Sequence, residues 1–140
     1  MENDGEDHDV AKEIVRVPVI SDALEKANVP LSVAVKANGF VFCSGMPPMN
    51  PKTGEIVRGD IETQTRAVLD SLKVVLEASG SSLEQVVKVI VFIANSAYFP
   101  TVNAIYKEYF KSDPPARTFA TVGSWPWEFD IEIECVALAE

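Results

Sequence analysis

The sequence contains few of the residues from which metal sites and nucleophilic catalytic sites are usually built. Its 140 residues include one histidine, His8, and two cysteines, Cys43 and Cys135, which lie far apart in the chain. A zinc site takes about four ligands, mostly histidine and cysteine, and this set is too small to supply them. It also leaves no Ser-His or Cys-His pair for nucleophilic catalysis. We therefore expect no metal and no other cofactor.

Long apolar runs and positive charge are scarce as well. The longest apolar run, Val89 to Ala94, has the length of a strand and falls far short of the roughly 18 residues of a membrane span. Twelve basic residues against 21 acidic ones give a formal net charge of −9. Because the apolar runs are short, we expect no membrane partner. Proteins that hold nucleic acid need a basic surface, so we expect no nucleic-acid partner either. Both cysteines lie in apolar runs, which is typical of buried thiols in a reducing compartment, and we expect a cytoplasmic protein.

The chain begins with an acidic segment and continues as one domain. The first ten residues, MENDGEDHDV, carry five acidic side chains. That composition has the wrong sign for a mitochondrial presequence and is too polar for a secretory signal. We interpret residues 1–12 as a flexible acidic tail, in which His8 is inert, and residues 13–140 as a single domain.

Hydrophobic periodicity predicts an α+β domain. Residues 21–28 fit either a short helical turn or a loop, and Asn38-Gly39 indicates a two-residue hairpin turn. Two helices on one face of a mixed sheet would leave the other face bare, which favours oligomerisation. The predicted strands are 14–17, 32–37, 40–43, 86–94, 118–122 and 130–134, and the predicted helices are 60–79 and 100–110.

Arg117 and a row of carboxylates stand out near the end of the chain. Pro114-Pro115 gives the arginine a stiff approach into a strand, and the run from Asp130 to Glu134 places alternate acidic residues on one face. Two strands joined by a short turn would bring Arg117 close to Glu132. The alternative is an ordinary surface ion pair on an exposed sheet face.

The chain resembles the Rid family of reactive intermediate deaminases, also known as L-PSP endoribonucleases. The resemblance runs from about Pro30 to the C-terminus. It rests on Ser44-Gly45, Pro48-x-Asn50-Pro51-Lys52-Thr53-Gly54-Glu55, Val86-Val87-Lys88 with Val91-Phe92, Val102-Asn103-x-x-Tyr106, Pro115-Ala116-Arg117 and Glu132-Ile133-Glu134. Membership would imply a chorismate-mutase-like two-layer fold and a homotrimer with clefts between subunits. The implied reaction is hydrolysis of enamines and imines, such as 2-aminoacrylate, to 2-keto acids and ammonia.

The resemblance assigns roles to individual residues. Arg117 matches the substrate-binding arginine, whose planar fork suits a carboxylate. Glu132 matches the glutamate that would orient and deprotonate water, so Arg117 and Glu132 are the catalytic candidates. Ser44 and Asn103 match positions that line the pocket. Taken without the resemblance, Ser44 reads as a turn residue and Asn103 as a solvated helix position.

Two positions depart from the family pattern. Leu31 stands where members carry a tyrosine, and Phe119 stands where they carry a cysteine. Both residues would line the substrate cleft and make it more apolar, which leaves the preferred 2-imino acid open. Trp125-Pro126-Trp127 is either a further part of that lining or a pair of packing tryptophans.

Three functions compete at this point. An imine deaminase is favoured because Arg117 and Glu132 are both present. An endoribonuclease is disfavoured, since acid-base cleavage of RNA usually relies on histidine and the net charge repels the substrate. A non-catalytic trimer that binds small carboxylates or partner proteins stays open because of Leu31 and Phe119.

Overall fold

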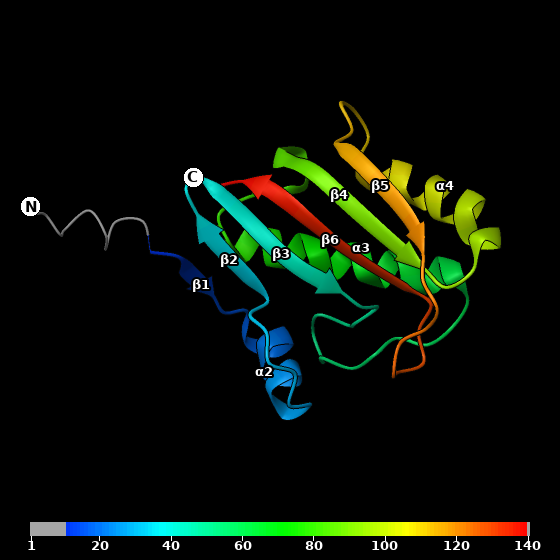
Figure 1. Ribbon diagram of the computed structural model, residues 1–140, viewed down its shortest axis with the longest axis horizontal. Coiled ribbons are helices and arrows are strands. Elements are labelled where there is room, and N and C mark those ends of the chain that lie inside the picture. Colours follow the sequence, from blue (N-terminus) through cyan, green and yellow to red (C-terminus); the bar gives the residue numbers. More distant parts are fainter. Residues whose placement is uncertain (1–10, 140) are drawn as a thin grey trace, which may run out of the picture.

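The computed structural model describes residues 11–139, which form one mixed β-sheet with helices packed against it (Figure 1). Six strands are hydrogen-bonded in the order β1-β2-β3-β6-β4-β5. Neighbouring strands are antiparallel except β4 and β5, which run parallel. The predicted α+β class and mixed sheet are therefore confirmed. The strands are β1 Glu13–Val15, β2 Ala34–Ala37, β3 Phe40–Met46, β4 Val86–Ile93, β5 Ala116–Thr121 and β6 Ile131–Leu138.

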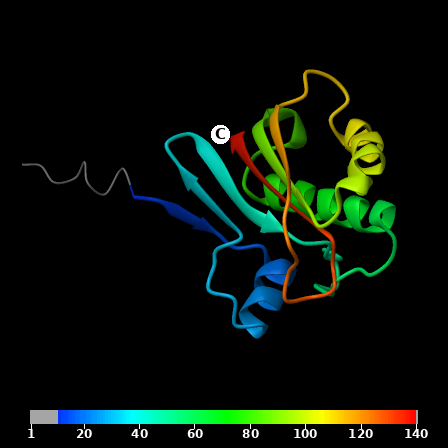
Figure 2. The same cartoon turned by 45° about the vertical axis from the view of Figure 1, so that its right-hand side comes forward.

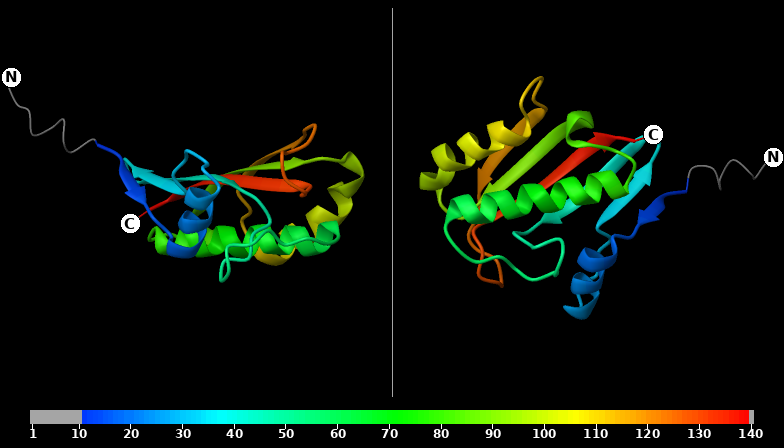
Figure 3. Two further views of the ribbon diagram at one scale, coloured as in Figure 1. Left: turned by 90° about the horizontal axis from the view of Figure 1, so that it is seen from below. Right: turned by 180° about the vertical axis from the view of Figure 1, so that it is seen from behind.

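Two long helices cover one face of the sheet, as predicted (Figure 3). Helix α3, Ile61–Ala78, begins after Asp60, whose carboxylate accepts a hydrogen bond of 2.8 Å from the backbone N–H of Thr63. Helix α4, Phe99–Tyr109, carries a proline in its first turn, where the missing N–H has no helical partner to lose. Two short 3₁₀ turns, η1 Leu83–Gln85 and η2 Ser96–Tyr98, flank β4.

A third helix occupies the segment that the sequence left undecided. Helix α2, Pro18–Lys26, starts with a proline and has no side-chain N-cap, so the usual start signal is weak. It lies at one end of the sheet, beside β1 and β2 (Figure 1). The prediction of two helices was thus incomplete, although it placed the two that cover the sheet.

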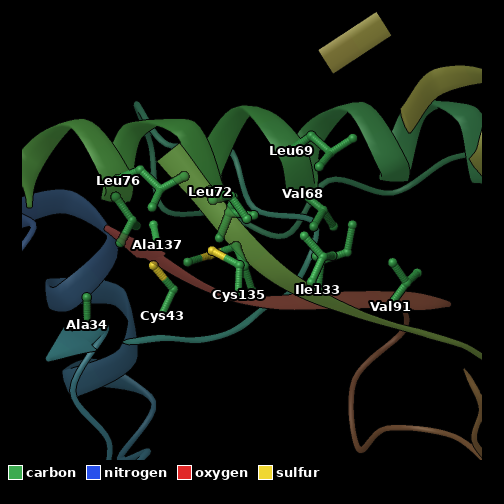
Figure 4. Close-up of a cluster of buried hydrophobic side chains, with 14 of the residues drawn as sticks. Ala34, Cys43, Val68, Leu69, Leu72, Leu76, Val91, Ile133, Cys135 and Ala137 are labelled. Atoms are coloured by element: carbon green, nitrogen blue, oxygen red, sulfur yellow. The ribbon is translucent and has the colours of Figure 1, made fainter. Parts of the chain in front are cut away.

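The core lies between the sheet and helices α3 and α4. Leu72 and Leu76 of α3 point toward Cys135 and Ala137 of β6 (Figure 4). Cys135 is directly opposite Cys43 of β3, and both are free, buried thiols, as expected of small apolar residues in strands. In β6 the buried side chains alternate with half-buried ones, which fixes the two faces of the sheet.

The opposite face of the sheet carries no helix (Figure 3). One row across it runs through Ile14, Val35, Phe42 and Val136, which are paired strand by strand. Ile14 and Phe42 are large apolar residues, yet their exposed fractions are 52% and 46%. The uncovered face that the sequence predicts is therefore present.

Two smaller predictions have clear outcomes. The hairpin turn between β2 and β3 is formed by Asn38 and Gly39, with φ values of 55° and 84°, which suit asparagine and glycine. Most of the predicted acidic tail, including His8, lies outside the described residues. Within residues 11–139, the helices are too short or too polar to span a bilayer.

Candidate functional site

Arg117 is held on the helix-covered side of the sheet. Its register partner on β4 is Val89, which is buried beneath the helices. The Arg117 Nη1 donates a hydrogen bond of 2.8 Å to Oδ1 of Asn103 on α4. The guanidinium carbon lies 4.8 Å from the ring centre of Tyr106, 5.0 Å from that of Phe119 and 5.9 Å from that of Phe99. These five residues form what we call the arginine half-site, in which aromatic faces and one amide hold the guanidinium in place.

The arginine half-site is electrostatically suited to an anion. Arg117 and Asn103 line an open groove of about 660 Å³ together with Lys107 and Lys111, and no Asp or Glu contributes to the groove lining. The other three arginines, Arg16, Arg58 and Arg66, each form ion pairs with carboxylates. Among the described residues, Arg117 is the arginine that lacks a carboxylate partner.

Glu132 lies on β6, on the face of the sheet turned away from the helices. Its register partner is Phe92, and Phe92 alternates with the buried residues Val91 and Ile93. The carboxylate approaches Gly45 so closely that a Cβ on Gly45 would overlap Glu132 Oε1. Any side chain at position 45 would therefore displace the Glu132 carboxylate.

The environment of Glu132 favours its protonated form. Burial raises the pKa of the Glu132 carboxyl above its usual value, and the nearby Glu134 carboxylate raises it further. A hydrogen bond with the Trp125 side chain acts in the opposite direction. A half-buried carboxyl with a raised pKa holds a proton more readily than an exposed one, which suits a group that accepts and returns protons.

A small apolar cavity adjoins Glu132. It has a volume of about 180 Å³ and is lined by Leu31, Gly45, Trp127, Phe129 and Glu132, together with residues of α2. We call it the Leu31 cavity. The segment between β5 and β6, drawn in orange in Figure 2, carries Trp127 and Phe129, and through them it shares the lining of this cavity with α2.

The structure separates the predicted site residues into two groups. Asn103 and Phe119 accompany Arg117, whereas Leu31 accompanies Glu132. Ser44 precedes Gly45 and donates a hydrogen bond of 2.6 Å from its Oγ to the carbonyl of Ser32. Ser44 therefore stays close to Glu132, but its hydroxyl proton is already engaged with the backbone.

The prediction that adjacent strands bring Arg117 and Glu132 together is wrong. Strand β4 lies between β5 and β6, because the chain returns after β5 and inserts β6 between β3 and β4. Arg117 and Glu132 also project from opposite faces of the sheet, as their register partners Val89 and Phe92 show. Within one chain, the two charged groups belong to separate half-sites.

Some site residues escaped the sequence analysis. Phe99 lies edge-on to Phe119, with 4.7 Å between ring centres, yet it reads in the sequence only as the residue before Pro100. Both alternatives for Trp125-Pro126-Trp127 hold in part, because both tryptophans pack on Phe129 and Trp127, which is 51% exposed, also lines the cavity. Among residues 11–139, His, Cys, Asp and Glu side chains form no cluster that fits a metal ion.

Comparisons with known proteins place this arrangement among described relatives. A family model described as Endoribonuclease L-PSP matches residues 21–139. A RutC family protein of Pyrococcus horikoshii is 47% identical over 111 residues, covering 79% of this chain and 88% of the relative. The chloroplastic Reactive Intermediate Deaminase A of Arabidopsis thaliana is 41% identical over 128 residues, covering 91% of this chain and 66% of the relative. A crystal structure of a Rid-family protein from Yersinia pestis superimposes with a TM-score of 0.83 at 37% identity, covering 92% of this chain and 100% of that one.

Proposed function

The chain belongs to the L-PSP endoribonuclease family, also called the Rid family, and from that premise we propose that it hydrolyses 2-imino acids and their enamine tautomers. The products are the corresponding 2-keto acid and ammonia. The family includes a plant relative named as a reactive intermediate deaminase, which supports the reaction class. We further propose that the protein acts in the cytoplasm, although some relatives are named as chloroplastic or mitochondrial.

The observation that carries the proposal is the guanidinium of Arg117, which has no carboxylate partner among residues 11–139. Asn103 and three aromatic rings hold it, and the groove beside it contains no acidic side chain. A protein with a net charge of −9 keeps carboxylates near most of its arginines. A free, fixed fork is what a substrate carboxylate requires for two parallel charge-assisted hydrogen bonds.

Glu132 supplies the proton chemistry in this proposal. Its carboxylate takes a proton from a water molecule while the water oxygen attacks the carbon of the C=N bond. Glu132 then returns this proton to the nitrogen, which gives a carbinolamine. As the C=O bond forms, the carbinolamine hydroxyl proton is transferred to the amino nitrogen, the C–N bond breaks and ammonia leaves. The raised pKa of Glu132 makes the carboxylate a better proton acceptor than an exposed glutamate, as this role requires.

A complete site then requires more than one copy of the chain. Arg117 and Glu132 lie on opposite faces of the sheet, so the arginine half-site of one copy must meet the glutamate of another. We propose a homotrimer whose clefts lie between subunits, with the apolar sheet face around Phe42 buried in the assembly.

Ammonia release from a freshly generated imine tests the function. An amino-acid dehydratase produces 2-aminoacrylate in the assay, and the expected result is ammonia release faster than the uncatalysed rate. Arg117→Lys should abolish the acceleration, whereas the matched control Arg16→Lys should not, because Arg16 is paired with Asp22 and Glu25 at the surface.

Two results would contradict the proposal. Tight keto-acid binding with no hydrolysis of any imine would indicate a binding module. Cleavage of RNA that persists through repurification and disappears in Arg117→Lys would indicate a ribonuclease.

A further inference from the structure

We infer that the Leu31 cavity binds the substrate side chain, so that this protein prefers 2-imino acids with branched aliphatic or aromatic side chains. The inference rests on the proposed function and adds the class of substrate. The cavity is walled by aliphatic and aromatic groups, and Glu132 is its single charged lining residue. Such a lining suits an alkyl or aryl group next to the reacting carbon.

The size of the cavity sets the range of side chains. Its volume is about 180 Å³, and an apolar cavity of about 150 Å³ holds a benzene molecule. A four-carbon branched chain or a phenyl ring therefore fits. The methyl group of the smallest imine would leave most of the cavity without contacts, and apolar walls gain little from such a ligand.

The position of Glu132 links the cavity to the chemistry. The reacting carbon of a 2-imino acid carries a carboxylate, a nitrogen and the side chain. Arg117 of another copy holds the carboxylate, and Glu132 holds the water that attacks this carbon. Since Glu132 forms part of the cavity wall, the side chain on the same carbon lies within reach of the apolar walls.

Exposed apolar groups at the mouth support the same reading. Leu31 and Trp127 are 44% and 51% exposed, and both line the cavity. Trp127 is stacked on Phe129, with ring centres 6.5 Å apart and planes 10° apart, which gives the cavity a flat aromatic wall. Large, fixed apolar surfaces of this kind discriminate ligands by the area they bury.

Titration with stable keto acids tests the inference without turnover. Isothermal titration compares pyruvate, 4-methyl-2-oxopentanoate and phenylpyruvate. We expect the two larger acids to bind at least about tenfold more tightly than pyruvate, because each further buried methylene group strengthens binding by about fourfold. The values of kcat/KM for the matching imines, generated by an amino-acid oxidase, should follow the same order.

A cavity-filling variant sharpens the test. Ala27 is an exposed residue that lines the cavity, so Ala27→Leu should weaken 4-methyl-2-oxopentanoate binding by about tenfold and leave pyruvate binding almost unchanged. Ala78→Leu is the matched control, since Ala78 is exposed at the end of α3 and lies outside the cavity lining. Trp127→Ala should weaken the larger acids in the same selective way.

The outcomes separate the two proposals. Equal affinity for all three keto acids, or equal losses of pyruvate and 4-methyl-2-oxopentanoate binding in Ala27→Leu, would overturn the inference. Imine hydrolysis without size preference would leave the proposed function intact. A complete lack of hydrolysis would overturn the proposed function, and the titrations would still decide whether the cavity selects side chains.

Discussion

At the scale of single residues, Arg117 differs from the other arginines in having an amide and aromatic rings as neighbours instead of a carboxylate. We predict that Arg117→Lys weakens pyruvate binding by about 10- to 100-fold, because lysine keeps the charge but loses the second parallel hydrogen bond. Isothermal titration measures the loss. Binding by Arg117→Lys as tight as in the parent protein would remove Arg117 as the carboxylate anchor.

Glu132 should affect the chemical step instead of binding. We predict that Glu132→Gln lowers kcat by at least about 100-fold while pyruvate affinity changes little, since glutamine keeps the size and polarity of the side chain but cannot act as a base. The parental kcat/KM should fall as the pH decreases through the raised pKa of Glu132. Parental turnover in Glu132→Gln would place the base elsewhere.

Glu132 also has a predicted cost in stability. A carboxyl whose pKa is raised in the folded state favours folding below its unfolded pKa, and this contribution is lost as the pH rises through the folded pKa. Glu132→Gln should therefore raise the unfolding free energy relative to the parent at about pH 7, with a smaller gain at about pH 4. Urea denaturation at both values measures the difference. A larger gain in acid would contradict the sign.

Tyr106 contributes a buried hydroxyl that has no hydrogen-bond partner among the described residues. Burial raises the pKa of Tyr106 to about 12, so its hydroxyl is protonated and uncharged at neutral pH. We predict that Tyr106→Phe raises the unfolding free energy by about 1 kcal/mol in urea denaturation. Tyr109→Phe is the control and should lower it by about 1 kcal/mol, because the Tyr109 hydroxyl donates a hydrogen bond of 2.7 Å to Asp70. Equal effects of the two changes would refute the argument.

At the scale of elements, Gln64 joins α3 to the start of β6. Its Nε2 donates to the Gly59 carbonyl at 2.9 Å and to Asp130 Oδ2 at 3.0 Å, and its Oε1 accepts from the Asp130 N–H at 2.8 Å. We predict that Gln64→Leu lowers the unfolding free energy by about 2–4 kcal/mol, since it leaves the backbone N–H of Asp130 without a partner. Urea denaturation measures this loss.

Gln85→Leu provides the comparison for Gln64→Leu. Gln85 is half-buried and accepts one side-chain hydrogen bond, of 3.1 Å, from Ser82. Its replacement should therefore cost less than about 1 kcal/mol. Similar losses of unfolding free energy in the two variants would show that the Gln64 hydrogen bonds between α3 and β6 add no more stability than the single bond of Gln85. Gln64→Leu should also weaken binding of large keto acids, because the bridge fixes the segment that carries Trp127.

Local elements could be predicted because their signals lie within a few residues. The spacing of Val68, Leu72 and Val75 predicts α3, and all three residues are buried in it. Helix α2 stayed undecided because Pro18 begins it without a side-chain cap. The weaker the local signal, the more the element depends on packing that the sequence does not display.

The order of the strands could not be predicted in the same way. Alternation of Ile131, Glu132 and Ile133 tells which side chains share a face, but it does not say which strand lies next to β6. The insertion of β6 between β3 and β4 is decided by contacts distant in sequence. The residue types at the site were therefore recognisable, while their division into two half-sites was not.

At the scale of the whole molecule, the proposed function makes the site a property of the proposed assembly. Arg117 and Glu132 are on opposite faces of one sheet, so a cleft that contains both takes them from different subunits. The proposed trimer then has a testable consequence that no single-chain site shares. Arg117→Lys subunits retain Glu132, and Glu132→Gln subunits retain Arg117, so a mixed trimer can rebuild an intact cleft.

We predict that mixing the two inactive variants restores activity. After subunit exchange at equal concentrations, every mixed cyclic trimer contains one cleft with both native residues, which gives about a quarter of the parental activity under random assembly. Ammonia release is measured before and after exchange, and light scattering confirms that trimers are present. The double variant Arg117→Lys with Glu132→Gln, mixed with either single variant, is the control and should restore nothing beyond the single-variant level. If the mixture of single variants stays inactive while subunits exchange freely, both residues act within one chain, and the shared cleft is refuted.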